Sequence, residues 1–216
     1  MTVRISNHGR AWRAAATAVV VTAVFMSNLD LWIVNVALVA IGRGLHGSLA
    51  SLSWVLSAYA VTLAALLIPA GRLGDRIGHR TVFLGGMALF TLASGACAAA
   101  PDLAVLIAAR TLQAAGAAAL LPSSLALLLA SFPPERRLAA ARGWAAVGAL
   151  AAVAGPVFGG LLVTLSWRWV FVVNLPVGLA AGIAARRVLP RPPGRDSGPV
   201  PDLAWAAPGW GSPSAR

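Results

Sequence analysis

Six long apolar runs constrain what this chain can fold into more than any other feature of its sequence. Most of them reach the roughly 20 residues that a helix needs to cross a lipid bilayer, and the last is near the lower limit of about 17. Charged residues make up 11% of the chain, whereas a soluble domain has about a quarter. We therefore predict an all-α integral membrane protein, a six-helix bundle with helices at 14–41, 49–70, 81–100, 103–131, 138–165 and 169–185.

Arginines gather in alternate connections between these runs and so predict an orientation. If the N-terminus is cytoplasmic, fourteen arginines lie in cytoplasmic segments and only Arg43 and Arg168 lie in outer loops. The positive-inside rule favours this topology, a multi-pass protein of the cell (plasma) inner membrane with both termini cytoplasmic. Residues 1–13 are then a cytoplasmic tail, and residues 186–216, rich in proline, glycine and arginine, are predicted to be disordered.

The net charge of +11 does not indicate nucleic-acid binding, because the arginines lie at the ends of apolar runs and not on a polar face with aromatic residues. Cys97 is the only cysteine, which leaves no disulfide framework and no Cys/His spacing for a metal. The sequence offers no Ser/His/Asp set and no pair of carboxylates at a usable spacing. We predict no enzyme, no cofactor and no metal, and expect the lipid bilayer and a small-molecule substrate as partners.

Asp30 and Arg110 are the ionisable residues deep inside apolar runs. Such residues are costly in a membrane and by default mark a functional site in the bundle interior, although a structural salt bridge is the alternative. At 1.5 Å per residue, Asp30 lies about 16 Å and Arg110 about 10 Å below the outer end of its run. We predict that they pair, directly or through water, as a proton or cation switch in which protonation of the carboxylate releases the arginine.

Two polar neighbours extend this predicted coupling site. Gln113 follows Arg110 by three residues, so both share one helix face. Asn35 follows Asp30 by five residues and lies about 140° around the helix, where we expect it to hydrogen-bond a neighbouring helix.

Small residues mark the fifth run, "GALAAVAGPVFGG". Ala151, Gly155 and Gly159 recur every four residues, which lets helix backbones approach closely. Pro156 removes a backbone donor, so a kink is expected there. In the sixth run, Pro176 is expected to interrupt the helix midway.

The connection "GRLGDRIGHR", Gly71–Arg80, combines glycines for a tight turn with three arginines. Asp75 is unusual there, because we place it just past the C-terminal end of a helix, whose dipole disfavours a carboxylate. It therefore needs a cationic neighbour, for which Arg76 or Arg80 is the local candidate, or the N-terminus of another helix.

Five segments resemble motifs of the major facilitator superfamily, in particular of its fourteen-helix drug:proton antiporter branch. They are "LDLWIVNVAL" at Leu29–Leu38, "GRLGDRIGHR", "RTLQAAGAAAL" from Arg110, "GPVFGG" from Gly155 and "WRWVFVVNLPVG" from Trp167. The loop motif is matched by Gly71, Leu73, Asp75, Arg76, Gly78 and Arg80, and the fifth-helix antiporter motif by Gly155, Pro156, Gly159 and Gly160.

Two departures from these motifs stand out. His79 occupies a position where a basic residue is usual. Trp32 replaces the usual threonine near Asp30, and its indole is expected to narrow or reshape the substrate path.

The resemblance implies proton-gradient-driven export of lipophilic, often cationic compounds through two six-helix bundles around a central cavity. It also implies that Asp75 belongs to a gate held against the other bundle. This chain supplies one bundle, the N-terminal half, and we interpret it as a truncated or frame-shifted product that lacks its C-terminal half, with a homodimer as the alternative. A second hypothesis is a non-transporting membrane fragment or interaction module that pairs with another membrane protein.

Overall fold

The computed structural model describes residues 7–189, and their side chains from residue 14 onward except that of Leu49. Over this range the described chain is helical, and six spans are long and apolar enough to cross a membrane. The helices are α1 Asn7–Leu45, α2 Leu49–Ile77, α3 His79–Ala99, α4 Leu103–Ala130, α5 Pro134–Val163, α6 Trp169–Val172 and α7 Asn174–Val188.

The helices reach beyond the predicted runs, mainly at the arginine-rich end of the bundle. α1 already begins at Asn7, so residues 7–13 are helical and not a separate tail. α2 continues to Ile77, and α5 begins at Pro134, four residues earlier than expected. Hydropathy marks only the stretch inside the hydrocarbon, whereas the backbone hydrogen bonds of a helix continue past it.

The predicted C-terminal tail begins too early. Residues 186–188 form the last turn of α7, and the helix ends at Val188. The remainder of that predicted tail, residues 190–216, lies outside the described part of the chain.

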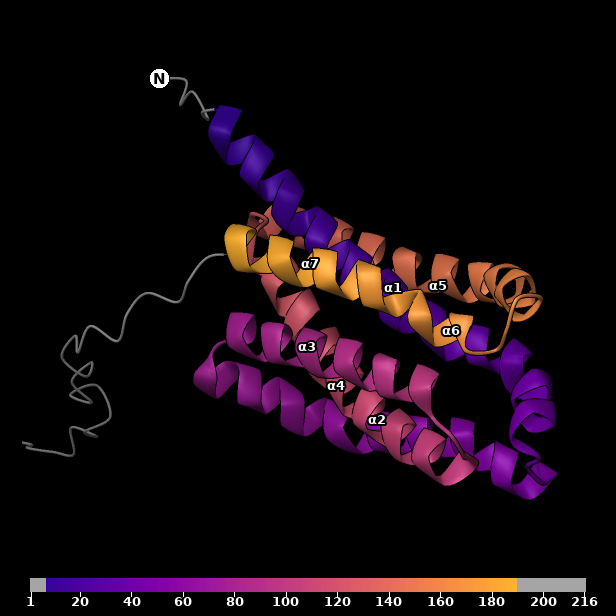
Figure 1. Cartoon of the computed structure of the whole chain (residues 1–216). Helices are drawn as coiled ribbons and strands as arrows, with labels where there is room; N and C mark the ends of the chain where they lie inside the picture. The colour runs from indigo at the N-terminus through magenta and orange to yellow at the C-terminus, as the bar shows by residue number, and fades with distance from the viewer. Residues whose placement is uncertain (1–6, 190–216) are drawn as a thin grey trace, which may run out of the picture.

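The chain passes back and forth along the bundle, with α1, α5 and α7 on one side and α2, α3 and α4 on the other (Figure 1). The beginning of α1, the α2–α3 junction, the α4–α5 connection and the end of α7 share one end. α4 packs mainly against α2 and α3, α1 packs against α5, and α7 packs against both α1 and α3. A Cβ at Gly116 of α4 would lie 2.6 Å from the backbone nitrogen of Phe90 in α3, so only glycine permits this close packing.

Two apolar clusters fill the interior, one toward each end. The first includes Met26, Phe90 and Ala114, and the second includes Ile33 and Leu106. In α1, α3 and α4 the chain passes from one cluster to the other across a short stretch that carries buried polar residues. A layer of buried polar residues therefore lies between the two apolar clusters.

The sixth span is interrupted, but not midway as predicted. The break falls at Val173, between α6 and α7 and close to the beginning of the span. Pro176 explains this position, because its ring crowds the carbonyl of the residue four before it, Val172, and leaves that carbonyl without its helical donor.

Candidate functional site

Asp30 is the centre of the buried polar layer. It lies on α1 and is only 1% exposed. One carboxylate oxygen accepts a hydrogen bond from Nη1 of Arg110 at 2.6 Å, which forms a salt bridge with α4. The other accepts from Nε2 of Gln113 at 2.9 Å and from Nδ2 of Asn174 at 2.7 Å. Three donors from two other helices therefore stabilise the ionised carboxylate.

Arg110 reaches this carboxylate from α4 with a side chain that is fully buried. Its Nη1 also donates to Oε1 of Gln113 at 2.7 Å. Its guanidinium lies over the ring of Tyr59 from α2, 4.1 Å from the centroid, and 5.9 Å from the centroid of the Phe171 ring. Nε and Nη2 have no hydrogen-bond partner among the described residues, so aromatic faces surround the part of the cation that the carboxylate does not neutralise.

Gln113 joins the ion pair to α3. Its Nε2 donates to Oγ of Ser94 at 2.8 Å, and that hydroxyl donates to the backbone oxygen of Phe90 at 2.8 Å. The thiol of Cys97 lies 3.7 Å from Oε1 of Gln113. The contacts of Gln113 with α1, α3 and α4 orient both its amide NH₂ and its amide oxygen. Gln113 therefore positions Asp30 and Arg110 relative to each other.

The predicted pairing of Asp30 with Arg110, and the place of Gln113 beside them, are therefore found in the structure. Ser94, Tyr59 and Asn174 also belong to this cluster, although they were not predicted from the sequence. A signal was present for Asn174, because it is an uncharged polar residue in an apolar run just before Pro176, and such residues hydrogen-bond across membrane helices. In the sequence Ser94 resembled a small packing residue, and no pattern around Tyr59 indicated a contact with Arg110.

Asn35 does not belong to this cluster. Its side chain is exposed, and its Nδ2 donates to the backbone oxygen of Leu31, one turn earlier in the same helix, at 2.8 Å. The expectation that it bonds a neighbouring helix is wrong for the described residues, because its position 140° from Asp30 turns it away from the bundle centre.

The predicted gating loop is mostly helical. Gly71, Asp75 and Arg76 lie in the last two turns of α2, and Arg80 lies in the first turn of α3. Only Gly78 separates the helices, and its φ of 95° is a conformation that favours glycine.

The partner of Asp75 is not an arginine. Its carboxylate lies 3.2 Å from Nε2 of His79, and Asp75 is 72% exposed. Arg80 turns the other way, and its Nε and Nη2 each donate at 3.0 Å to the backbone oxygens of Leu189 and Arg186. Arg80 thus satisfies carbonyls at the C-terminal end of α7, where cations are favoured.

The small-residue stripe of α5 faces α1, and the two helices approach closely there. A Cβ at Gly155 would meet the Cβ of Trp32 at 2.5 Å, and one at Gly159 would lie 3.1 Å from Ile33. Gly160 has no neighbour within 4 Å and takes no part in this contact. Helix α5 runs through Pro156 without a break, so a kink there stays a prediction.

Comparisons with known proteins agree with this architecture. The sequence profile described as Major Facilitator Superfamily matches residues 20–211. The methylenomycin A resistance protein of Bacillus subtilis is 44% identical over 174 residues, which are 80% of this chain and 37% of that protein. The tetracenomycin C resistance and export protein of Streptomyces glaucescens is 42% identical over 182 residues, 84% of this chain and 34% of that protein.

The fold is also that of a solved structure. A bacterial homolog of the human lysosomal transporter Spinster, in an inward-facing and occupied conformation, superposes with a TM-score of 0.76 at 19% identity. The match covers 84% of this chain and 45% of that one, and the bundle is similar to the N-terminal half of such a transporter. The chain spans about a third of the length of the curated relatives it matches. With a matching profile over most of its length and relatives of 42% and 44% identity, this multi-pass membrane chain belongs to the major facilitator superfamily, a family of transporters.

Proposed function

We propose that this chain forms one bundle of a proton-driven exporter of lipophilic, often cationic compounds. The observation that carries the proposal is the Asp30–Arg110 pair, fully buried between two apolar clusters at the meeting point of α1, α3, α4 and α7. A charge inside the membrane is energetically costly and by default marks a functional site. The relatives named for methylenomycin A and tetracenomycin C resistance support export as that function.

In the proposed cycle Asp30 carries the exchangeable charge and Arg110 tunes it. A proton entering on one side binds the Asp30 carboxylate, which cancels its charge and weakens its bond to Nη1 of Arg110. The guanidinium keeps its contacts with Gln113 and the Tyr59 ring, so the cation does not leave the site. When the proton leaves on the other side, the ion pair forms again. A cationic substrate would compete with Arg110 for the same carboxylate.

The assembly and orientation are part of the proposal. The arginine-rich end, with the start of α1 and the end of α7, is placed on the cytoplasmic side of the inner membrane by the positive-inside rule. Alternating access needs a second bundle to move against this one, either a C-terminal half or a second copy of the chain. The gating contact of Asp75 belongs to that interface, whereas Gly155 and Gly159 let α5 move against α1 inside this bundle. No enzymatic step is proposed.

Transport in liposomes tests the proposal. The purified chain, reconstituted in vesicles with an imposed pH gradient, should expel a lipophilic cationic dye, and Asp30→Asn should abolish this efflux. Asp102→Asn is the matched control, because Asp102 is exposed and caps α4 through the backbone nitrogen of Val105, a role that asparagine also fills. Efflux that survives Asp30→Asn would exclude Asp30 as the coupling residue.

A second candidate is a non-transporting membrane module that pairs with another membrane protein. The observation that favours it is the exposure of α2 and α5, whose most apolar stretches are each only 17% buried, against 56% for α3. Folded wild-type chain that expels no dye would favour this candidate for the chain alone.

A further inference from the structure

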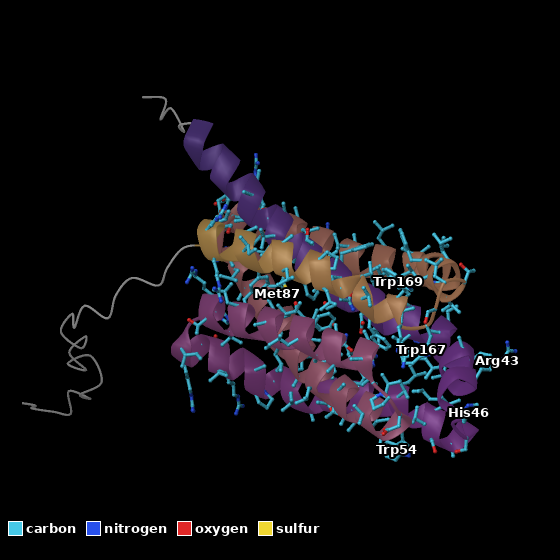
Figure 2. The ribbon with its side chains drawn as sticks, viewed as in Figure 1. Arg43, His46, Trp54, Met87, Trp167 and Trp169 are labelled. Atoms are coloured by element: carbon cyan, nitrogen blue, oxygen red, sulfur yellow. The ribbon has the colours of Figure 1, made fainter. Side chains whose placement is uncertain are left out.

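A groove runs along the outside of the bundle between α3 and α7, away from the ion pair. Its volume is about 280 Å³, and its walls include Met87 and Thr91 from α3 and Gly178, Gly182 and Arg186 from α7. Figure 2 places Met87 between these two helices. The flanking side chains Leu92, Leu179 and Ile183 are apolar and largely exposed, so the groove opens toward the hydrocarbon of the membrane.

Two glycines one turn apart shape this groove. At Gly178 the helices touch, because a Cβ there would collide with the side chain of Thr91. At Gly182 a Cβ would lie 3.6 Å from Cγ of Met87, an ordinary contact distance, and no other atom from the described part of another helix lies within 4 Å of it. A larger side chain at position 182 would therefore extend into the groove.

The end of the groove nearest the end of α7 is positively charged. Arg186 lines the groove and is exposed, and Arg187 follows it. Neither arginine forms a salt bridge with any carboxylate in the described part of the chain. Arg80 donates to the carbonyls of Leu189 and Arg186 and so fixes the end of α7, while the Arg186 side chain is exposed.

We propose that this groove binds one anionic phospholipid, with an acyl chain between α3 and α7 and the phosphate on Arg186. The apolar walls match an acyl chain, and a guanidinium binds phosphate oxygens in a bidentate geometry. Basic pockets between membrane helices at the cytoplasmic side are known to select anionic headgroups, and the positive-inside orientation puts Arg186 on that side. The proposal does not rest on the proposed transport activity.

Native mass spectrometry of the detergent-purified chain tests this site, with dioctanoyl phosphatidylglycerol and dioctanoyl phosphatidylcholine added in parallel. We expect one phosphatidylglycerol to be retained about fivefold more than phosphatidylcholine, the preference that one arginine near the headgroups provides. Arg186→Gln should remove this preference. Arg142→Gln is the charge control, because Arg142 is exposed on α5 and does not line the groove.

A second pair of variants tests the hollow itself. Gly182→Leu should reduce retention of both lipids, because its side chain fills the groove. Gly85→Leu is the matched control, since Gly85 is on α3 with no neighbour within 4 Å. Circular dichroism establishes that each variant is folded. Equal retention of the two lipids by the wild type, an equal loss with Arg142→Gln, or full retention with Gly182→Leu would each overturn the proposal.

Discussion

Residues 7–189 contain two pairs of a carboxylate and a basic side chain, which differ mainly in their surroundings. The side chains of Asp30 and Arg110 lie 2.6 Å apart and are fully buried, whereas those of Asp75 and His79 lie 3.2 Å apart and are 72% and 28% exposed. Water can replace either partner of the exposed pair, but only protein groups solvate the buried one. Breaking the exposed pair should therefore change the free energy of unfolding little, whereas breaking the buried pair should change it greatly.

The largest effect is expected when the buried pair loses its cation. Arg110→Leu leaves the Asp30 carboxylate without its main partner in an apolar interior, which should cost about 3–5 kcal/mol of the free energy of unfolding. Denaturant unfolding of the chain in detergent measures it. Arg142→Leu, on the exposed surface of α5, should change that free energy by less than about 0.5 kcal/mol.

A double variant sharpens this result. Asp30→Leu combined with Arg110→Leu removes both charges, so it should be much less destabilised than the sum of the two single changes. Additive effects would mean that the two groups do not interact, which would contradict the ion pair.

Asn174 is expected to come next. Asn174→Ala removes one of the three donors to Asp30 and should cost about 1.5–3 kcal/mol, the range for hydrogen bonds to charged groups. The same unfolding assay measures it, with Asn35→Ala as the control. Asn35 has an equivalent amide but bonds only its own helix, so its removal should have little effect. Equal losses for the two variants would contradict the assigned cluster.

The aromatic contact of Arg110 should have a smaller effect. Tyr59→Leu removes the ring face 4.1 Å from the guanidinium, and a desolvated cation–π contact contributes up to about 2 kcal/mol. Tyr59→Phe keeps that face and should stay close to the wild type. If Tyr59→Phe were as unstable as Tyr59→Leu, the hydroxyl and not the ring would support Arg110.

How much of this could be predicted differs between the fold and the site. The six spans follow from apolar length alone, because the bilayer imposes it. The end of α2 could not be predicted in this way. Gly71 and Gly74 suggested a turn, but the helix continues through both residues and ends before Gly78. Glycine only weakens a helix, and the structure ends α2 where the backbone adopts a positive φ.

The charged members of the site were predictable, and the neutral ones were not. Asp30 and Arg110 are conspicuous because an ionisable residue in hydrocarbon needs a partner, and their similar depth predicted which one. Ser94 and Tyr59 are tolerated in any membrane helix, so only the packing of α2, α3 and α4 determines that they meet the pair. The partner of Asp75 was also not predictable, because Asp75 meets His79 only if α2 continues almost to the beginning of α3.

The smallest effect is expected at the exposed pair. Asp75→Asn removes an ion pair that exists only while His79 is protonated, and exposed pairs contribute about 0–1 kcal/mol. It also removes a negative charge from the last turn of α2, where the helix dipole disfavours it, so the two effects oppose each other. Denaturant unfolding of the variant in detergent should therefore show a change of less than about 1 kcal/mol. A loss comparable to that of Arg110→Leu would mean that Asp75 is buried against something else, and the contrast between the two pairs would fail.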